Sequence, residues 1–462
     1  MSPFRNILRL SAGDFLAKTL SFISFVYVAR VLGVATYGVL EFALSVMTYF
    51  LLLADGGLEI WATRAVAQGQ PVAALAGRIV PLRFLLAILA FAALCILVPL
   101  LPAYPSLREI LLLFGLTLFA QAVSLKWVFM GREQMSTVAL GLVAAQIVTS
   151  VALLVTVRDP SGLLWIPVVR LAGDTALAGY FAYRYRRAYG RLPLRVTVAE
   201  SKDALRGAFV MGGAHSLAQV SYNFDSVLLG LLVGSTAVGW YNAAYRPITA
   251  LLSLPVSYFL GLFPVLSRTF RDNPAEFQSL IGRSLHWLGI FALPVALGGM
   301  VWAKPAITFL FGSEYAGAVL PFQVLAWSAA LVILRGTFRQ ALNAAGRQDL
   351  DLRCAVAATL LNVTANLLLI PYFGIVGAAV ATLLSEVLWL GLVSYFAHRH
   401  ITELRLSTFL VQPATAATVV AIGLWLMPSI PWLYQIPVAA LFYFGMLVAL
   451  DRNRWRSLLL LS

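Results

Sequence analysis

Several basic side chains of this 462-residue chain lie within long apolar stretches, where a charge is costly. A charged residue at the centre of a bilayer costs roughly 2.5–3.5 kcal/mol on insertion scales, so it needs a partner, water or a route to the interface. Lys18, Arg246 and Arg335 lie deepest, whereas Lys126 and Arg339 are near enough to the ends of their stretches to reach the interface. Arginine binds phosphate oxygens bidentately. We therefore predict that these residues bind an anionic ligand.

Carboxylates also occur in apolar stretches, at Asp14, Asp55, Asp174, Asp225 and Glu386. A buried carboxyl group tends to have a raised pKa, which suits proton exchange, and its ionised form can bind sodium. Asp225 stands out because the residues that follow it are apolar. We predict that these acids couple the protein to a proton or sodium gradient. Pairing with an intramembrane arginine is the alternative role.

Two of these charges have an opposite charge four residues away. Lys18 follows Asp14, and Asp174 follows Arg170, at a spacing that places both side chains on one helix face. Each pair could neutralise itself without a ligand. Local neutralisation is the favoured interpretation for Arg170 and Asp174, and it stays open for Asp14 and Lys18.

The composition places the elements that carry these residues in a membrane. The chain is 61% hydrophobic and 11% charged, whereas a soluble domain is about half apolar and a quarter charged. Cys95 and Cys354 lie in apolar runs and are predicted to be small core residues, with no disulfide and no metal site. A span needs about 20 apolar residues. About fourteen spans are predicted, at 8–32, 36–62, 79–101, 108–131, 136–157, 162–184, 207–232, 237–266, 284–310, 317–345, 352–371, 374–397, 407–427 and 432–450.

The loops between these spans carry Lys and Arg mainly on one side. Alternation from the N-terminus leaves only Arg30, Arg108, Arg158 and Lys304 on the opposite side, whereas Arg83 and most other basic residues fall on the N-terminal side. Because basic loops stay in the cytoplasm, both termini are predicted to be cytoplasmic, in a multi-pass inner-membrane protein. The net charge of +14 is spread among short loops, which argues against a nucleic-acid partner.

An internal duplication organises the spans. Gly33 and Gly38 between the first two spans match Gly234 and Gly239 at a single offset. Six spans precede the charged connection 184–206, so the second copy has the same orientation as the first, related by an axis along the membrane normal. The predicted parts are an N-lobe at 1–190, a C-lobe at 191–400, and two additional helices at 401–462. This organisation is typical of a two-lobed transporter.

Four passages give the chain a family resemblance. They are ARVLG at 29–33 followed by Tyr37 and Gly38, ADGGL at 54–58, LFG at 310–312 with Tyr315 and Ala318, and ALNAAGR at 341–347. With these passages, in this order, the chain resembles the Wzx-like polysaccharide and oligosaccharide flippases of the multidrug/oligosaccharidyl-lipid/polysaccharide (MOP) exporter superfamily. The resemblance implies an all-α, V-shaped fold of two six-helix lobes, similar to that of MATE transporters.

The resemblance also implies a function. Such proteins move an undecaprenyl-pyrophosphate-linked oligosaccharide, such as an O-antigen or exopolysaccharide repeat unit, from the cytoplasmic to the outer leaflet by alternating access. The basic residues of the spans would then line a cationic central cavity. The expected partners are this lipid-linked substrate, membrane lipids and other membrane proteins of glycan assembly.

Other functions stay open. A lipid II flippase would have the same number of spans and a cationic cavity. A MATE-type drug antiporter would favour an acidic lumen, whereas the deepest charges without an evident partner here are basic. A membrane polymerase or ligase would need a large external loop, and a scaffold would not need charges at mid-bilayer. No nucleophile elbow, Walker loop or zinc motif occurs, so neither an enzyme nor a cofactor is predicted beyond possible proton or sodium coupling.

Overall fold

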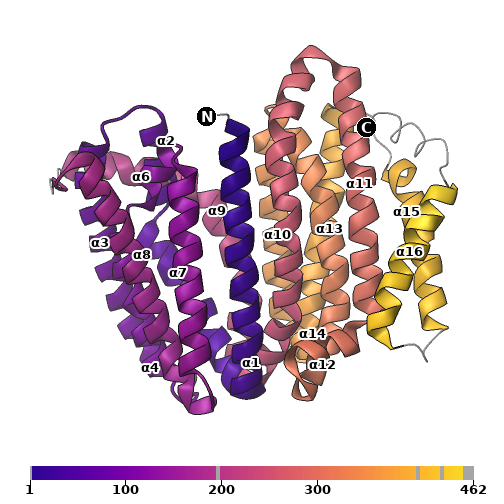
Figure 1. The fold of residues 1–462 in the computed structure, drawn as a ribbon, viewed down its shortest axis with the longest axis horizontal. Helices are drawn as coiled ribbons and strands as arrows, with labels where there is room; N and C mark the ends of the chain where they lie inside the picture. Colours follow the sequence, from indigo (N-terminus) through magenta and orange to yellow (C-terminus); the bar gives the residue numbers. More distant parts are fainter. Residues whose placement is uncertain (1–2, 194–197, 402–405, 427–430, 451–462) are drawn as a thin grey trace. The chain divides into compact units, whose positions relative to one another are not determined.

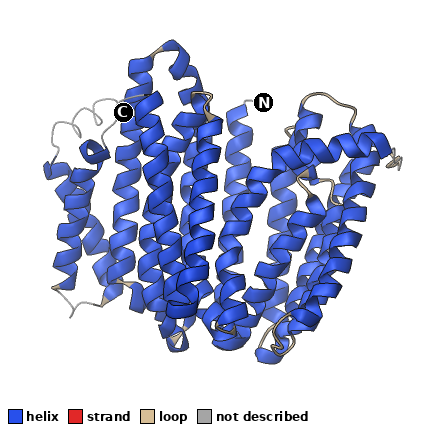
Figure 2. Ribbon diagram, turned by 180° about the vertical axis from the view of Figure 1, so that it is seen from behind, coloured by secondary structure: helices blue, strands red, loops and turns tan. Residues whose placement is uncertain are grey.

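The computed structural model describes residues 3–193, 198–401, 406–426 and 431–450. Every regular element within these ranges is a helix, and Figure 2 accordingly draws helices in blue and no strand in red. Seven helical segments of the described residues are long and apolar enough to cross a membrane. The predicted all-α fold is confirmed, and the total of fourteen spans stays a prediction.

The chain divides into two compact units, Met1–Asn242 and Ala243–Ser462, here called unit 1 and unit 2. The division falls within helix α10 (Figure 1). The lobe boundaries at 190 and 400 stay predictions. The helices up to the division are α1 (Pro3–Asp55), α2 (Leu58–Ala67), α3 (Val72–Leu97), α4 (Leu107–Gly115), α5 (Thr117–Ala122), α6 (Lys126–Gly131), α7 (Met135–Thr156), α8 (Trp165–Tyr189), α9 (Val198–Leu232) and α10 (Ser235–Asp272). Those after it are α11 (Pro274–Val301), α12 (Ala303–Phe311), α13 (Val319–Ala344), α14 (Gln348–His400), α15 (Leu406–Trp425) and α16 (Trp432–Leu450).

Single glycines join predicted spans into longer helices. In α1 the spans 8–32 and 36–62 meet at Gly33, which has a φ of 73°. In α14 the spans 352–371 and 374–397 meet at Gly374, which has a φ of 53°. Glycine adopts this left-handed region without the clash that a Cβ would cause. The helix therefore changes direction within one residue and needs no loop.

The predicted span 108–131 is not one helix. It forms the three short helices α4, α5 and α6. At the first break the hydroxyl of Thr117 donates to the carbonyl of Phe114, a local bond that competes with the regular helical ladder. The last of the three pieces begins at Lys126, so this break sets the position of a candidate site residue.

Hydrophobic cores hold the elements that carry the site. In unit 1, Trp127 of α6 is fully buried in a cluster formed with α2, α3 and α8. In unit 2, Phe338 of α13 is buried in a cluster with α11 and α14. Cys354 lies in that second core as predicted, whereas Cys95 is exposed on α3, so its prediction as a core residue was wrong. Its face of α3 is directed away from the core.

The duplicated glycines lie against each other within unit 1. A Cβ added to Gly38 would come within 1.8 Å of the carbonyl oxygen of Ser235, and one added to Gly239 would come within 2.3 Å of that of Val34. Ser235 and Val34 stand at the same offset in the repeat as the two glycines. In each copy of the motif, the glycine therefore packs against the backbone of the other copy, at a distance that leaves no room for a Cβ atom.

Candidate functional site

A deeply buried ion pair joins two helices of unit 2. Arg335 of α13 is 2% exposed and Glu386 of α14 is 5% exposed. The Nε of Arg335 donates to Oε2 of Glu386 at 2.5 Å, and its second nitrogen donates to Oε1 at 3.2 Å. Such bidentate geometry is the strong form of an arginine–carboxylate contact. Arg335 is not the unmatched cation that the sequence suggested.

A second pair and a tryptophan extend this contact, and together the residues Arg335, Arg339, Asp351, Glu386 and Trp389 are here called the unit 2 cluster. Arg339, one turn after Arg335, donates to both oxygens of Asp351 at 2.9 and 3.1 Å. The guanidinium carbons of Arg335 and Arg339 lie 3.6 and 5.2 Å from the ring centroid of Trp389. The ring therefore contacts both cations, an attractive arrangement that strengthens when water is excluded.

A four-residue ion cluster lies in unit 1 and is here called the unit 1 cluster. Arg83 is 4% exposed, and it lies 3.1 Å from an oxygen of Asp55 and 3.7 Å from one of Glu59. Lys126 lies 2.7 Å from the other oxygen of Glu59. Two carboxylates and two cations thus neutralise one another. The predicted substrate residue Lys126 and the predicted coupling residue Asp55 belong to one network.

The end of α1 explains how Asp55 reaches this cluster. Gly56 and Gly57 both have positive φ and end the helix directly after Asp55. The Asp55 carboxylate then accepts the backbone N–H of Gly57 at 3.2 Å and that of Glu59 at 3.3 Å, at the start of α2. Free N–H groups at a helix start favour a negative charge there. The passage 54–58 therefore orients a carboxylate.

Arg83 is a site residue that the sequence analysis placed incorrectly. The charge alternation counts Arg83 with the basic residues of the N-terminal side, but α3 begins at Val72 and carries Arg83 into the packed interior. There it also donates to the carbonyl of Ser124 at 3.3 Å. The predicted span 79–101 already contained it, and two acids one turn apart on α1 and α2 were the signal for a basic partner. The sequence does not predict Asp351 and Trp389 as site residues, because no nearby residue pattern marks either of them.

Asp225 lies in a different setting, between α9 and α10. It is 4% exposed, and the hydroxyl of Tyr241 donates to it at 2.5 Å. In the next layer the amide of Asn242 donates to Ser226 at 3.0 Å. Two side-chain bonds thus join the helices of this hairpin. Asp225 is thus a buried carboxylate that accepts a hydrogen bond from a neutral tyrosine hydroxyl.

The remaining predicted residues are spread over other helices. Asp174 of α8 accepts from Arg170 at 3.3 Å, which confirms their local pairing, and from Gln121 at 3.2 Å. Lys18 is exposed on α1 and Arg246 is half-buried on α10. The side chain of Asp14 lies outside the described residues, so its pairing with Lys18 stays a prediction. No cluster of metal ligands occurs in the described ranges.

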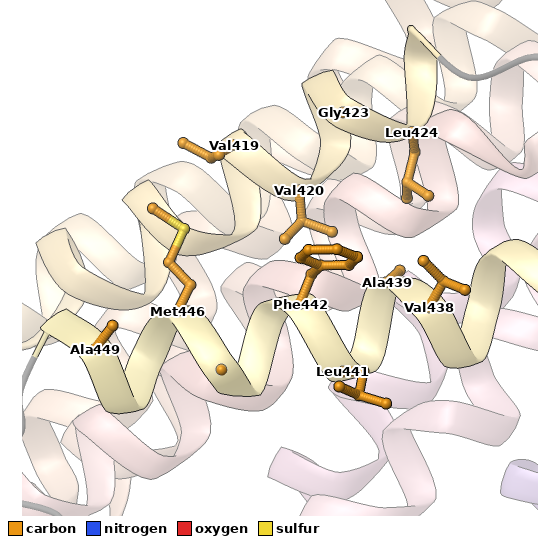
Figure 3. A pocket seen from close by; sticks show the side chains of 11 residues that line it. Val419, Val420, Gly423, Leu424, Val438, Ala439, Leu441, Phe442, Met446 and Ala449 are labelled. Atoms are coloured by element: carbon orange, nitrogen blue, oxygen red, sulfur yellow. The ribbon is translucent and has the colours of Figure 1, made fainter.

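An apolar groove runs between α15 and α16 (Figure 3). It has a volume of about 560 Å³, and Val420 of α15 and Phe442 of α16 point toward one another across it. Gly423 and Gly445 also line it, and a Cβ on either would meet no atom within 4 Å. Its surface offers no charge to a ligand. Hydrocarbon is the one chemistry that this lining suits.

Comparison with known proteins places these helices in a family and a fold. A family described as "Polysaccharide biosynthesis protein" matches residues 4–270. A putative O-antigen transporter of Escherichia coli K12 is 23% identical over 421 residues, covering 87% of this chain and 98% of that one. A probable flippase AglR of Haloferax volcanii is 33% identical over 184 residues, which is 38% of each chain.

Solved structures show the same fold. The lipid II flippase MurJ in an inward closed conformation aligns with a TM-score of 0.78 at 13% identity, covering 96% of this chain and 99% of that one. An inward-facing MATE transporter of the MOP superfamily aligns with a TM-score of 0.64 at 16% identity, covering 84% and 97%. The predicted MOP-type membrane fold is confirmed.

Proposed function

We propose, from the premise that this chain belongs to the polysaccharide biosynthesis protein family, that it flips an undecaprenyl-pyrophosphate-linked oligosaccharide to the outer leaflet. Its O-antigen and polysaccharide flippase relatives support a flippase role. The observation that carries the substrate class is the alignment with a putative O-antigen transporter over 87% of the chain. Because the relatives are transporters, we propose transport and not catalysis as the activity of this chain.

The ion clusters supply a means to bind and release a pyrophosphate. In the unit 2 cluster, Glu386 occupies the donors of Arg335 that a phosphate oxygen would use. When Glu386 takes up a proton it becomes neutral, and Arg335 is free to bind the substrate's phosphate with the same bidentate geometry. When the proton leaves, the carboxylate competes for the guanidinium and displaces the phosphate. Arg339 and Asp351 form a second pair of this kind.

Alternating access would be driven by an ion gradient. Asp14, Asp55, Asp174 and Asp225 are further candidates for proton or sodium exchange, with Asp225 first because it is buried and accepts a hydrogen bond from a tyrosine hydroxyl. Lys18, Lys126 and Arg246 would extend the cationic path for the diphosphate. In this proposal both termini lie in the cytoplasm of an inner-membrane protein, and other membrane proteins of glycan assembly receive the product.

A lipid II flippase is the second candidate, because the likeness to such a structure covers 96% of the chain. Lipid II shares the polyprenyl pyrophosphate, so the same basic residues would serve. The two substrates differ only in the sugar and peptide. A drug antiporter of MATE type has the same fold, but its cationic substrates would not use paired arginines.

Complementation tests the proposal. A bacterial strain that lacks its O-antigen flippase should regain surface glycan and clear its accumulated lipid-linked precursor when it expresses this chain. A strain depleted of its lipid II flippase, tested in parallel, distinguishes lipid II transport from O-antigen transport. Rescue of growth in that strain without glycan in the first would overturn the O-antigen proposal.

Variants of the unit 2 cluster test the exchange step. Glu386→Gln keeps the shape of the side chain but cannot be ionised, so it should bind substrate and fail to release it, and precursor should remain. Asp225→Asn should weaken the response to a collapsed proton or sodium gradient. Glu109→Gln on α4 is a matched control, because Glu109 is exposed. Full glycan export by the Glu386→Gln variant would rule out the proposed role of proton exchange at Glu386.

A further inference from the structure

A second groove lies in unit 1, and none of its lining residues belongs to the unit 1 cluster. Its volume is about 800 Å³, within the range of about 300–1,000 Å³ that small-molecule sites occupy. One wall is α8, and the other is formed by α3, α5 and the connection that follows α5. Val80, Ala120, Val123 and Leu125 make this second wall apolar.

The α8 wall is a row of small residues with an arginine at one end. Thr175, Gly179, Ala182 and Arg186 line the groove at spacings of three and four residues, which places them on one face of the helix. A Cβ on Gly179 would meet no atom within 4 Å, so the missing side chain leaves open space along the groove. The small residues make a channel for a chain-like ligand, and the arginine stands at one end.

The charged end of the groove has unused hydrogen-bond donors. Arg186 and Arg191 line it, both are exposed, and neither has an ion pair among the residues that the structure describes. Tyr185, which also lines the groove, is 2% exposed, and its buried hydroxyl has no hydrogen-bond partner among those residues. A buried hydroxyl without a partner is unfavourable by about 1–3 kcal/mol. An oxygen-rich group at this end would satisfy all three side chains.

We propose that this groove binds an anionic phospholipid of the cytoplasmic leaflet. One acyl chain lies along the small-residue face of α8, and the phosphate accepts hydrogen bonds from Arg186 and Arg191. Tyr185 donates to an oxygen of the same headgroup region. The lipid is a bound component of the fold and not the transported substrate.

The position and charge of the groove favour this occupant. The groove follows the predicted span 162–184 to its cytoplasmic end, just beyond which Arg186 and Arg191 line it. Basic pockets between helices on this side of a membrane attract anionic headgroups. Two guanidinium groups that have no carboxylate partner in the described part of the chain favour a lipid with net negative charge over a zwitterionic one. The inference rests on the proposed membrane orientation, and it is independent of the sugar transported.

Native mass spectrometry of the purified, delipidated full chain tests the proposal. Phosphatidylglycerol should bind at one site, and phosphatidylethanolamine should bind at least tenfold more weakly. The double variant R186Q/R191Q should lower the affinity for phosphatidylglycerol at least tenfold. The variant G179L should lower it as well by filling the groove, through a mechanism that leaves the charges unchanged.

Matched variants control for charge and for folding. R184Q/R187Q makes the same charge change on α8 outside the groove, and G391L places leucine at another helical glycine with open space around it. Both should bind phosphatidylglycerol like the wild type. Equal losses in test and control variants, or none in either, would overturn the site.

Competition separates the sources of phosphate. Inorganic phosphate should not displace phosphatidylglycerol, because it lacks the chain that fills the groove. Undecaprenyl pyrophosphate should also leave the lipid in place, and displacement by either compound would overturn the phospholipid assignment. Because binding is measured on isolated protein, the result does not depend on whether the chain restores glycan export.

Discussion

The two ion clusters contain the same numbers of charges in different surroundings. Each has two carboxylates and two cations. In the unit 1 cluster both carboxylates and Lys126 remain between 28 and 30% exposed. In the unit 2 cluster the side chains of Arg335 and Glu386 are 2% and 7% exposed. Equal net charge therefore does not make the two clusters equivalent, because a buried charge depends on its partner more strongly than a partly exposed one does.

The two clusters also differ in their hydrogen bonds to the backbone. Asp55 of the unit 1 cluster is held by two N–H groups at the start of α2 and would keep them if Arg83 were lost. Glu386 sits in the middle of α14, where the backbone N–H groups are already used by the helix. The unit 1 cluster is thus anchored locally, whereas the unit 2 cluster is held by contacts between helices.

The largest effect is expected from Glu386→Ala. The change leaves Arg335 buried without its carboxylate, and such a loss destabilises by about 3–5 kcal/mol. Thermal unfolding in detergent should show a marked fall in Tm. The double variant Glu386→Ala with Arg335→Met should recover much of it, and Glu109→Ala on the exposed face of α4 should change little. A fall in the double variant as large as in the single one would contradict the pairing.

Arg83→Gln should have the next largest effect. It removes the ion pairs with Asp55 and Glu59 and the charge-assisted hydrogen bond to Ser124, a loss of about 1.5–3 kcal/mol, while Lys126 and the N–H groups of α2 still compensate the acids. The same unfolding assay measures it, with Arg108→Gln at an exposed position as control. A loss equal to that of Glu386→Ala would mean that local anchoring does not protect the unit 1 cluster.

Trp389→Leu tests the aromatic component that only the unit 2 cluster has. It should cost about 1–2 kcal/mol, because the ring contacts Arg335 at close range. Trp389→Phe keeps an aromatic face and should retain part of the stability. If leucine and phenylalanine behave alike in the unfolding assay, the ring contributes by filling volume and not by attracting the cations.

Lys126→Met should have the smallest effect, below about 1 kcal/mol, because the pair with Glu59 is partly solvated. Its contribution should shrink further at high salt, whereas that of the buried Arg335 pair should not. Unfolding at two salt concentrations compares them. Equal salt dependence in the two clusters would show that both are open to solvent.

Local spacing made some of this site predictable. The pairing of Arg170 with Asp174 follows from their spacing of four residues along one helix, and Gly33 marks where α1 changes direction. The pair Arg335–Glu386 spans 51 residues, and its formation depends on how α13 and α14 pack. No periodicity encodes that packing. The sequence therefore identified Arg335 and Glu386 as separate candidates with opposite roles, and only the fold joined them.

Helix boundaries account for the remaining errors. The predicted third span begins at residue 79, which leaves Arg83 near its N-terminal end, whereas α3 begins at Val72 and carries Arg83 into the packed interior. The apolar run 108–131 concealed two breaks, because hydrophobicity does not report local hydrogen bonds such as that of Thr117. Trp389 carried no signal, since an aromatic residue in an apolar span has the same composition whether or not it contacts a cation.

The contact between the two copies of the glycine motif has the form of a symmetric dimer interface. Gly38 meets Ser235 and Gly239 meets Val34, so each copy presents one patch to the matching patch of the other, as subunits related by a two-fold axis do. Here both patches belong to one polypeptide. In a homodimer, one codon would specify the glycine in both patches. Here Gly38 and Gly239 are encoded separately, so each position must remain glycine independently of the other.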